Sequence, residues 1–377
     1  MSAWPGKYVI GLTGNIATGK SVVRKMLEHL GAYGIDADAL GHRAMAKDAP
    51  AYQPVIDTFG RYVLGPDEQI DRTRLGRLVF SDPEALKALE KIVHPFIRQA
   101  VDLLIRRASQ KVVVVEAIKL LESPLRPGMD SIWVATATPE VQISRLMKKR
   151  GMTEETARQR VLLQSSQVEK IAAAHVVIRN DGSFEETWRQ VTAAWRTLFP
   201  VEEPTDRPAV PVARGEMVVE RAKPRQASEI AVFIGRVSKG KRKLSREDIM
   251  AAFGEKAYMF LRIDHRPVGL VGWQVENLVA RTNDVYLEDN LPLVNAMKAL
   301  LNEVEAASRD LQCEASLLFL PAQFVQHDQV WRSLGYEPRT VHSLGVRAWQ
   351  EAAQETMSQD EVMYFKQLRQ DRVLRPV

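Results

Sequence analysis

The sequence lacks the features of secreted and membrane-spanning proteins. It has one cysteine, Cys313, in 377 residues, so no disulfide can form within the chain, which fits a reducing compartment. The apolar neighbours of Cys313 indicate a buried structural thiol rather than a nucleophile. No apolar run approaches the roughly 18 residues that a membrane-spanning helix needs. Because a functional motif begins close to the N-terminus, we expect no signal peptide and a cytoplasmic protein without a membrane partner.

The sequence also has no strong excess of one charge sign. The formal net charge is +5 and the pI is about 9.2. A mildly basic surface suits phosphorylated small molecules and would also suit nucleic acid, but a solvated excess of lysine and arginine explains it more simply. We therefore expect no nucleic-acid partner. The strongest basic cluster, RVSKGKRKLSRED from Arg236, is interpreted as a solvated loop, with RNA or an acidic partner as the alternative.

Periodicity is missing from one internal segment. The stretch LFPVEEPTDRPAVPVARGE, residues 198–216, combines prolines and charges with neither a helical nor a strand period, which is typical of a linker. The length of the chain suits two domains. We predict an N-terminal domain at 1–200, a linker at 201–216, a second domain at 217–345 and a C-terminal helical tail at 346–377.

Strand-like and helix-like segments alternate through the first 200 residues. This alternation predicts an α/β fold with a parallel sheet and helices on both faces. The expected strands are YVIGLT (8–13), AYGIDAD (32–38), KVVVVEAI (111–118), SIWVATA (131–137) and AHVVIRND (174–181). Helical spacing is present in KSVVRKMLEHLG (20–31) and PEVQISRLMKKRG (139–151).

The turn after the first strand matches the phosphate-binding pattern G-x-x-x-x-G-K-[ST]. It follows a strand and opens a helix, as the motif requires, which argues against an ordinary connecting turn. Glycines let backbone N–H groups point inward, and the helix N-terminus adds positive potential. Lysine reaches the β- and γ-phosphates, and the serine hydroxyl ligates Mg²⁺. The predicted nucleotide site consists of Gly14, Asn15, Ile16, Ala17, Thr18, Gly19, Lys20, Ser21 and the adjoining Val22.

Two aspartates follow the second expected strand. Asp36 and Asp38 are expected at its carboxyl edge, where ligands bind in open α/β sheets, and strand alternation would put both on one face. A carboxylate there can accept a proton from an attacking hydroxyl or hold Mg²⁺ through water. Helix capping is the alternative and would explain one aspartate but not both. The phosphate turn by itself does not distinguish a kinase from a GTPase or a mechanical ATPase.

The first domain resembles the dephospho-CoA kinases from Tyr8 to about Phe199. The resemblance rests on the phosphate turn and on an ordered series of segments: IDADAL, LGRLVFSDPEALKALEKIVHPFI, VVVVEAIKLLE, TPEVQISRLMKKRGMT, RVLLQ and AHVVIRNDG. It implies a P-loop kinase fold that uses ATP and Mg²⁺ to phosphorylate the 3′-hydroxyl of dephospho-CoA.

The resemblance also implies roles for individual residues. Asp38 matches the acid that accepts the hydroxyl proton, Lys20 and Ser21 match the phosphate and Mg²⁺ residues, and Arg145 matches a lid arginine that neutralises charge on the transferring group. Gln164 and Asn180 match positions near the nucleotide or its lid. His94 matches a family histidine, with a packing role before Pro95 as the equal alternative. The residues assigned to the acceptor side are Asp36, His94, Glu116, Lys119 and Glu122.

The sequence departs from the family pattern in three places. Asn15 and Ala17 replace glycines of the phosphate turn, and a positive φ at Asn15, if the turn requires one, would strain most residues but asparagine least. Ile118-Lys119-Leu120 replaces Pro-Leu-Leu between two acids, which alters the acceptor pocket and introduces a lysine that could meet an acceptor phosphate. Lys149 replaces a second lid arginine and loses its planar fork.

The second domain resembles the GNAT acetyltransferase superfamily from Val218 to about Arg339, in the order of its elements. The order implies an α+β fold with a mostly antiparallel sheet. The superfamily's glycine-containing pyrophosphate turn is missing: the corresponding segment reads LEDNLPLVNAMK, with Pro292 in it and with Glu288 and Asp289 positioned to repel phosphate. This argues against acetyl transfer and makes acetyl-CoA binding doubtful. A degenerate domain with a binding, regulatory or structural role is at least as well supported.

Other functions remain open on the sequence alone. A P-loop kinase for another nucleotide or small alcohol would share most of the motifs. A nucleotide-dependent switch, with the second domain binding a partner, is an alternative of a different class.

Overall fold

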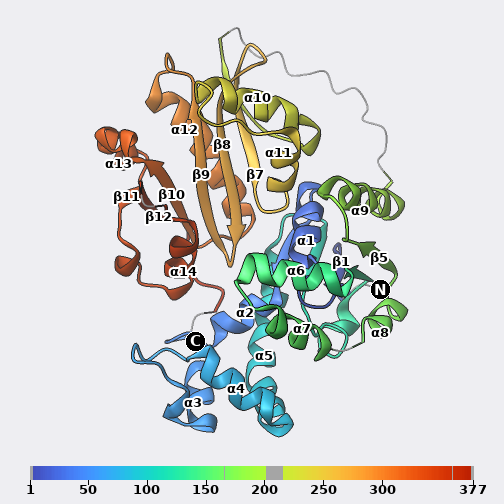
Figure 1. Cartoon of the computed structure of the whole chain (residues 1–377). Helices are drawn as coiled ribbons and strands as arrows, with labels where there is room; N and C mark the ends of the chain where they lie inside the picture. Colours follow the sequence, from blue (N-terminus) through green and yellow to red (C-terminus); the bar gives the residue numbers. More distant parts are fainter. Residues whose placement is uncertain (1–2, 165, 201–214, 359, 375–377) are drawn as a thin grey trace.

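The computed structural model describes residues 3–164, 166–200, 215–358 and 360–374. Figure 1 shows two β-sheets, one in an N-terminal half (3–200) and one in a C-terminal half (215–374). The predicted linker lies almost wholly outside the described residues. None of the helices in the described part of the chain combines the length and the apolar character needed to cross a bilayer.

The N-terminal half contains a five-stranded parallel sheet in the order β2-β3-β1-β4-β5. The predicted fold class is therefore confirmed for this half. Its strands are β1 (Tyr8–Thr13), β2 (Tyr33–Asp36), β3 (Val112–Glu116), β4 (Ser131–Thr136) and β5 (Val176–Arg179). All of β3 is buried, because apolar clusters cover both faces of the sheet. A run of β-branched residues is typical of such a central strand.

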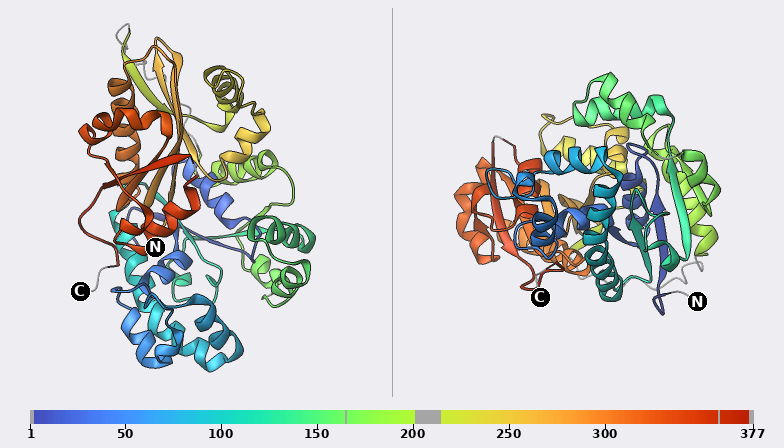
Figure 2. Two further views of the ribbon diagram at one scale, coloured as in Figure 1. Left: turned by 60° about the vertical axis from the view of Figure 1, so that its left-hand side comes forward. Right: turned by 90° about the horizontal axis from the view of Figure 1, so that it is seen from below.

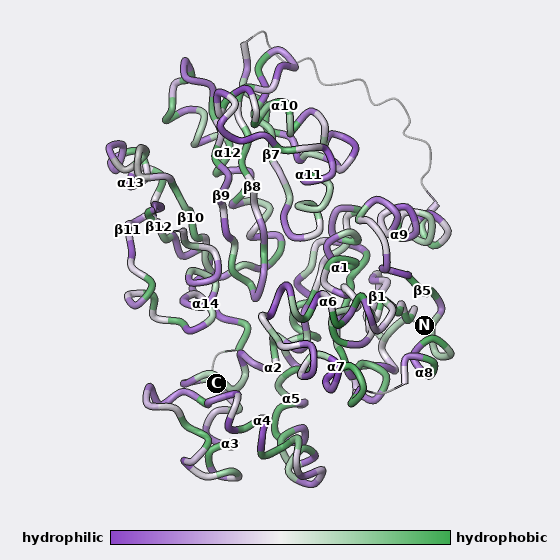
Figure 3. Tube along the Cα trace, in the orientation of Figure 1, coloured by the Kyte–Doolittle hydropathy of each residue, from purple (hydrophilic) through white to green (hydrophobic). Residues whose placement is uncertain are grey.

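Helices cover both faces of this sheet. The α-helices of the described N-terminal half are α1 (Lys20–His29), α2 (Ala37–Ala44), α3 (Tyr52–Phe59), α4 (Arg72–Ser81), α5 (Pro83–Arg107), α6 (Pro139–Arg150), α7 (Glu154–Leu162), α8 (Gln167–Ala172) and α9 (Phe184–Leu198). Helices α1 and α9 pack on one face, and α2 and α5 pack on the other. Hydrophobic and hydrophilic residues alternate along covering helices such as α9 (Figure 3).

The C-terminal half contains a seven-stranded sheet in the order β11-β12-β10-β9-β8-β7-β6, in which only β9 and β10 pair in parallel. The expected mostly antiparallel α+β fold is confirmed. The strands are β6 (Met217–Arg221), β7 (Ala257–Ile263), β8 (Arg266–Glu276), β9 (Val279–Leu287), β10 (Ala315–Pro321), β11 (Glu337–Pro338) and β12 (Glu361–Gln367). Cys313 is fully buried, as expected for a structural thiol.

Five α-helices accompany this sheet in the described residues: α10 (Ala227–Val237), α11 (Arg246–Ala252), α12 (Leu293–Asp310), α13 (Asp328–Ser333) and α14 (Arg347–Thr356). The long α12 packs on one face. Helices α10, α11 and α14 pack on the other.

The prediction of a helical C-terminal tail is wrong for its second part. After α14 the chain forms β12, which pairs antiparallel with β10 and also with β11. Met363 and Tyr364 of β12 are both buried, in the clusters on opposite faces of the sheet. A strand that is buried on both faces shows no alternation of polar and apolar residues, so its sequence resembles that of a buried helix segment.

The two halves share a buried interface formed by the tip of the β8–β9 hairpin. The tip reaches α1 and α2 of the N-terminal half (Figure 1 and Figure 2). Leu278 belongs to the apolar cluster around Val9, Tyr33 and Leu104 of that half. Asn277 and Leu278 both have positive φ, 51° and 61°, the backbone of a tight two-residue hairpin turn. An apolar side chain held in this conformation is thus part of the N-terminal core.

Candidate active site

The phosphate turn lies between β1 and α1 and depends on two glycines. A Cβ on Gly14 would lie 2.2 Å from the Ala135 carbonyl oxygen, and one on Gly19 would lie 1.9 Å from Asn180 Nδ2. Of the two residues that replace glycines, Ala17 and not Asn15 has a positive φ, of 58°. That conformation costs an alanine about 1 kcal/mol. The turn is therefore curled as a phosphate cradle requires, with mild strain at one residue.

Lys20 begins α1 and is almost completely buried, at 7% exposure. Its Nζ donates to the Asn15 carbonyl oxygen at 3.2 Å, across the inside of the turn. Burial lowers the pKa of Lys20, and the nearby carboxylates of Glu116 and Asp38 act in the opposite direction. A phosphate group in the cradle would supply the anionic partner that this ammonium group lacks within the loop itself.

Ser21 lies beside a buried carboxylate at the end of β3. Its Oγ donates to Glu116 Oε1 at 3.0 Å, while Arg24 Nε donates to Glu116 Oε2 at 2.8 Å. Arg24 also donates to Glu28 at 2.7 Å, so its guanidinium holds two carboxylates. A hydroxyl and a carboxylate side by side are the oxygen donors that Mg²⁺ prefers. The residues present therefore fit an Mg²⁺ ion shared with nucleotide phosphates.

Asp38 lies in the first turn of α2, not on the second strand. The strand ends at Asp36, so the prediction that the two aspartates share a strand face is wrong. Asp38 Oδ2 accepts from the Ile118 N–H at 3.0 Å. Burial raises the pKa of Asp38, against the lowering effects of this hydrogen bond and of Lys20. The carboxylate thus lies within the electrostatic reach of the lysine of the phosphate turn.

Asp36 serves as the N-cap of α2. Its Oδ1 accepts from the Ala39 N–H at 2.8 Å, which satisfies one of the free amides of the first turn. Burial, and then the neighbouring Glu116, raise the pKa of Asp36 to about 6. The capping alternative therefore explains Asp36, while Asp38 remains available for chemistry.

The sequence of the N-terminal half is similar to sequences of known proteins. The family model for dephospho-CoA kinase matches residues 8–186. The dephospho-CoA kinase of Geobacter sulfurreducens is 40% identical over 195 residues, covering 51% of this chain and 99% of that protein. The chain belongs to the dephospho-CoA kinase family. The family match takes up the N-terminal half and leaves the C-terminal half outside it.

Solved structures resemble each half separately. TT1252 from Thermus thermophilus is 32% identical with a TM-score of 0.47, and the match covers 52% of this chain and 99% of that one. A GNAT-family acetyltransferase from Staphylococcus aureus Mu50 is 13% identical with a TM-score of 0.34, covering 41% of this chain and 100% of that one.

The three residues that the family resemblance assigned to the nucleotide or its lid all contact the phosphate turn. Arg145 donates through Nη1 to Ala17 O at 3.2 Å and through Nη2 to Asn180 O at 2.8 Å. Gln164 Oε1 accepts from the Ile16 N–H at 2.6 Å, and Asn180 Nδ2 donates to Thr18 O at 2.9 Å. Burial lowers the pKa of Arg145. The fold therefore brings these three residues to the phosphate turn, although each lies more than a hundred positions away from it along the chain.

The predicted acceptor residues of the family lie around the segment that follows β3. Lys119 is largely exposed, and its Nζ pairs with Glu90 of α5 at 2.7 Å. The exposed Glu122 follows in the same segment, and the half-buried His94 lies on α5 just before Pro95. The Lys119–Glu90 pair thus ties the segment to the helix that carries His94.

Lys170 on α8 is a site residue that the sequence does not reveal. It is only 3% exposed, and its Nζ donates to Ile118 O at 3.2 Å. The same carbonyl accepts from Thr13 Oγ1 at 3.0 Å. Burial lowers the pKa of Lys170, and Asp38 and Lys20 both act on it. No motif marks this lysine, because its partners come from other elements of the fold.

Proposed function

We propose that the chain transfers the γ-phosphate of ATP to the 3′-hydroxyl of dephospho-CoA, giving CoA and ADP. Membership of the dephospho-CoA kinase family supports the reaction. One observation supports its location: Lys20, the Ser21–Glu116 pair and Asp38 meet at the carboxyl ends of β1, β2 and β3. Ligands bind at this edge in open α/β sheets.

The phosphate turn and Lys20 bind the nucleotide. Backbone N–H groups of the phosphate turn would donate hydrogen bonds to the phosphate oxygens, and Lys20 Nζ would leave the Asn15 carbonyl to bind the β- and γ-phosphates. Gln164, Arg145 and Asn180 hold the turn in its curled shape through the hydrogen bonds described above. Arg145 also brings positive charge toward the transferring group.

Ser21 Oγ and, through water, Glu116 would hold Mg²⁺ beside the phosphates. The ion would neutralise charge on the β- and γ-phosphates when bound. Arg24 keeps Glu116 in place by a buried charge-assisted hydrogen bond. Loss of Arg24 would leave the Glu116 carboxylate without its partner, so Arg24 acts as a positioning residue.

Asp38 accepts the proton of the acceptor hydroxyl. A general base works best when its pKa approaches the working pH, and burial moves the pKa of Asp38 in that direction. The positive charges of Lys20 and Lys170 favour the ionised form of this carboxylate. Lys119, Glu122 and His94 are our candidates for contacts with the acceptor, while Asp36 contributes by capping α2.

A coupled assay of ADP release tests this function. Dephospho-CoA should stimulate ADP release from ATP strongly, whereas nucleoside monophosphates should not. GTP should not replace ATP as the donor, and the product should carry a 3′-phosphate. Stimulation by a nucleoside monophosphate alone would indicate a kinase of another substrate. Nucleotide hydrolysis that needs no acceptor would indicate a switch protein, and either result would overturn the proposal.

The C-terminal half, we propose, supports the kinase structurally and does not transfer acetyl groups. Glu288 forms ion pairs with Arg236 and Arg266 at 2.9 Å each, and Asp289 pairs with Lys239 at 3.0 Å. Both acids, which precede α12, are therefore paired with basic side chains of the same half. Calorimetric titration of acetyl-CoA into the full chain, presaturated with dephospho-CoA and a non-hydrolysable ATP analogue, should release no heat. Saturable binding would overturn this proposal.

A further inference from the structure

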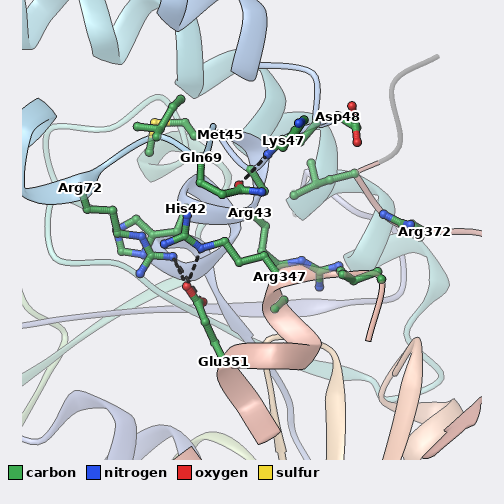
Figure 4. Close-up of a pocket in the computed structure, with 17 residues that line it drawn as sticks. His42, Arg43, Met45, Lys47, Asp48, Gln69, Arg72, Arg347, Glu351 and Arg372 are labelled. Carbon is green, nitrogen blue, oxygen red and sulfur yellow. Dashed lines mark hydrogen bonds and ion pairs between the residues drawn. The ribbon is translucent and has the colours of Figure 1, made fainter. Parts of the chain in front are cut away.

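A cavity of about 250 Å³ lies between the two halves, separate from the residues of the kinase site. Its walls come from the end of α2 and the loop that follows it, the start of α4, the start of α14 and the segment after β12 (Figure 4). Since two of these walls belong to the C-terminal half, the cavity exists only in the complete chain.

Basic side chains dominate the lining of this cavity. The lining cations are Arg43, Lys47, Arg72, Arg347 and Arg372, and the lining carboxylates are Asp48 and Glu351. Carboxylates outside the lining balance two of the cations: Glu314 pairs with Arg43 at 2.6 Å, and Glu68 pairs with Lys47 at 2.5 Å. Of the remaining three guanidinium groups, those of Arg72 and Arg347 share Glu351.

Glu351 is held by arginines from both halves of the chain. Arg347 Nε donates to Glu351 Oε1 at 2.8 Å, and Arg72 Nη2 lies 3.3 Å from the same oxygen. Figure 4 shows both side chains pointing toward this carboxylate. Arg372 lies over the Trp349 ring, 6.0 Å from its centroid. One internal carboxylate therefore occupies guanidinium groups that would otherwise bind an external anion.

Two of these arginines also influence the pKa of His42, which lines the same cavity. His42 lies on α2, one helical turn after Asp38. Desolvation, and then the Arg72 guanidinium, lower the pKa of its ring, and Arg347 adds to the effect. Glu351 acts in the opposite direction, so both arginines and their carboxylate lie within electrostatic reach of this ring.

We propose that this cavity binds a small organic phosphate, with Arg72, Arg347 and Arg372 as its ligands and Glu351 as an internal competitor. Planar guanidinium groups bind phosphate oxygens through paired hydrogen bonds. Met45, Ile70 and Leu374 line the rest of the cavity and suit a compact apolar body next to the phosphate. A ligand bound here would bridge the two halves and contact α2, the helix that carries Asp38.

Calorimetry on the full chain tests this site. The kinase site is first saturated with dephospho-CoA, Mg²⁺ and a non-hydrolysable ATP analogue, and inorganic diphosphate is then titrated as the probe. We expect one further site. Arg72→Gln and Arg372→Gln should each weaken it by about tenfold or more, because each removes a charge-assisted contact. Glu351→Gln should tighten it by about tenfold, because two arginines lose their competitor.

The gain expected for Glu351→Gln separates a binding role from a structural one, because a misfolded variant would not bind more tightly. Arg106→Gln is the matched control: Arg106 pairs with Asp102 on the surface of α5, outside the cavity, and its loss should leave diphosphate affinity unchanged. No diphosphate binding, weaker or unchanged binding by Glu351→Gln, or binding that is seen only when dephospho-CoA is omitted would each overturn the proposal. The last result would mean that the cavity belongs to the acceptor site.

Discussion

Arg43 of α2 and Glu314 at the start of β10 form an ion pair of 2.6 Å that joins the two halves of the chain. Both side chains are buried, with 9% and 1% exposed. Arg43 also donates to the Asn277 carbonyl oxygen at 2.8 Å, next to the tip of the β8–β9 hairpin. A buried pair with several hydrogen bonds fixes how the halves dock, because removal of one partner leaves a charge unpaired.

Arg43→Met should destabilise the whole chain. The Glu314 carboxylate would remain buried without its partner, at a cost of about 3–5 kcal/mol. Urea unfolding followed by fluorescence measures the change. Lys87→Met, which breaks the exposed Lys87–Glu84 pair, is the control and should cost less than about 1 kcal/mol. Equal effects of the two changes would contradict a structural role for the Arg43–Glu314 pair.

Leu278→Ala tests whether the hairpin of the C-terminal half belongs to the N-terminal core. Leu278 is 9% exposed and packs in that core, so truncation should cost about 2–4 kcal/mol in unfolding free energy. The exposed Leu162 provides the control, and Leu162→Ala should change stability by less than about 0.5 kcal/mol. If Leu278→Ala behaves like the control, the interface does not contribute to folding stability.

Asp38→Asn should abolish turnover while nucleotide binding persists. The amide keeps the shape of the side chain but cannot accept the hydroxyl proton, so kcat should fall by about 10²–10⁴-fold. Fluorescent ATP-analogue titration and the ADP-release assay measure the two quantities separately. Asp57→Asn, on the exposed face of α3, should leave both unchanged. A variant at position 38 with normal kcat would remove this residue from the mechanism.

Gly19→Ala should abolish nucleotide binding. The added methyl group would meet Asn180 Nδ2 at 1.9 Å, and alanine resists the φ of 86° that this position requires. The control is Gly240→Ala, which has a similar φ of 77° but no atom within 4 Å of the new methyl group. Both variants carry the backbone strain, so a selective loss of binding in Gly19→Ala isolates the close approach to Asn180.

His29 should make the chain sensitive to acid. Its Nε2 donates to the Phe253 carbonyl oxygen at 2.7 Å across the interface, and burial, with Arg221, lowers the pKa of His29 to about 3. The unfolded chain protonates this ring near its ordinary pKa of 6.5. Since the unfolded state then binds more protons, the contribution of His29 is present above pH 6.5 and is lost as the pH falls toward 3.

The comparison with His29→Gln isolates this effect. Asp36, whose pKa is raised to about 6, acts in the opposite sense over part of the same range in both proteins. Between pH 6.5 and 4 the wild type should lose up to about 1.4 kcal/mol per pH unit relative to the variant. Unfolding curves at several pH values measure the difference. Parallel pH profiles would show that His29 is not neutral in the folded protein.

The site was predictable where a short segment carries the chemistry. The phosphate turn supplies Gly14, Gly19, Lys20 and Ser21 within eight positions, so its geometry follows from local backbone conformation and one helix N-terminus. Asp38 was predicted at the right edge of the sheet but for the wrong reason, because capping by Asp36 ends the strand two residues earlier. Propensity does not resolve such a boundary.

Lys170 and Arg24 show why other parts of the site could not be predicted. Lys170 comes within electrostatic reach of Asp38 only because α8 returns beside the segment after β3. Arg24 lies one turn after Lys20 on α1, yet its role depends on Glu116, which is 92 positions away. The roles of these side chains come from long-range packing, which leaves no periodic signal in the sequence.

The sequence by itself determined the phosphate turn, the parallel character of the first sheet and the family of the N-terminal half, because each depends on local spacing or on an ordered series of motifs. Only the tertiary structure decided that the C-terminal half enters the N-terminal core through Leu278, that its tail completes a sheet with β12, and that arginines from both halves surround one cavity. These features depend on which apolar surfaces pack against each other, and burial is a property of the folded chain as a whole.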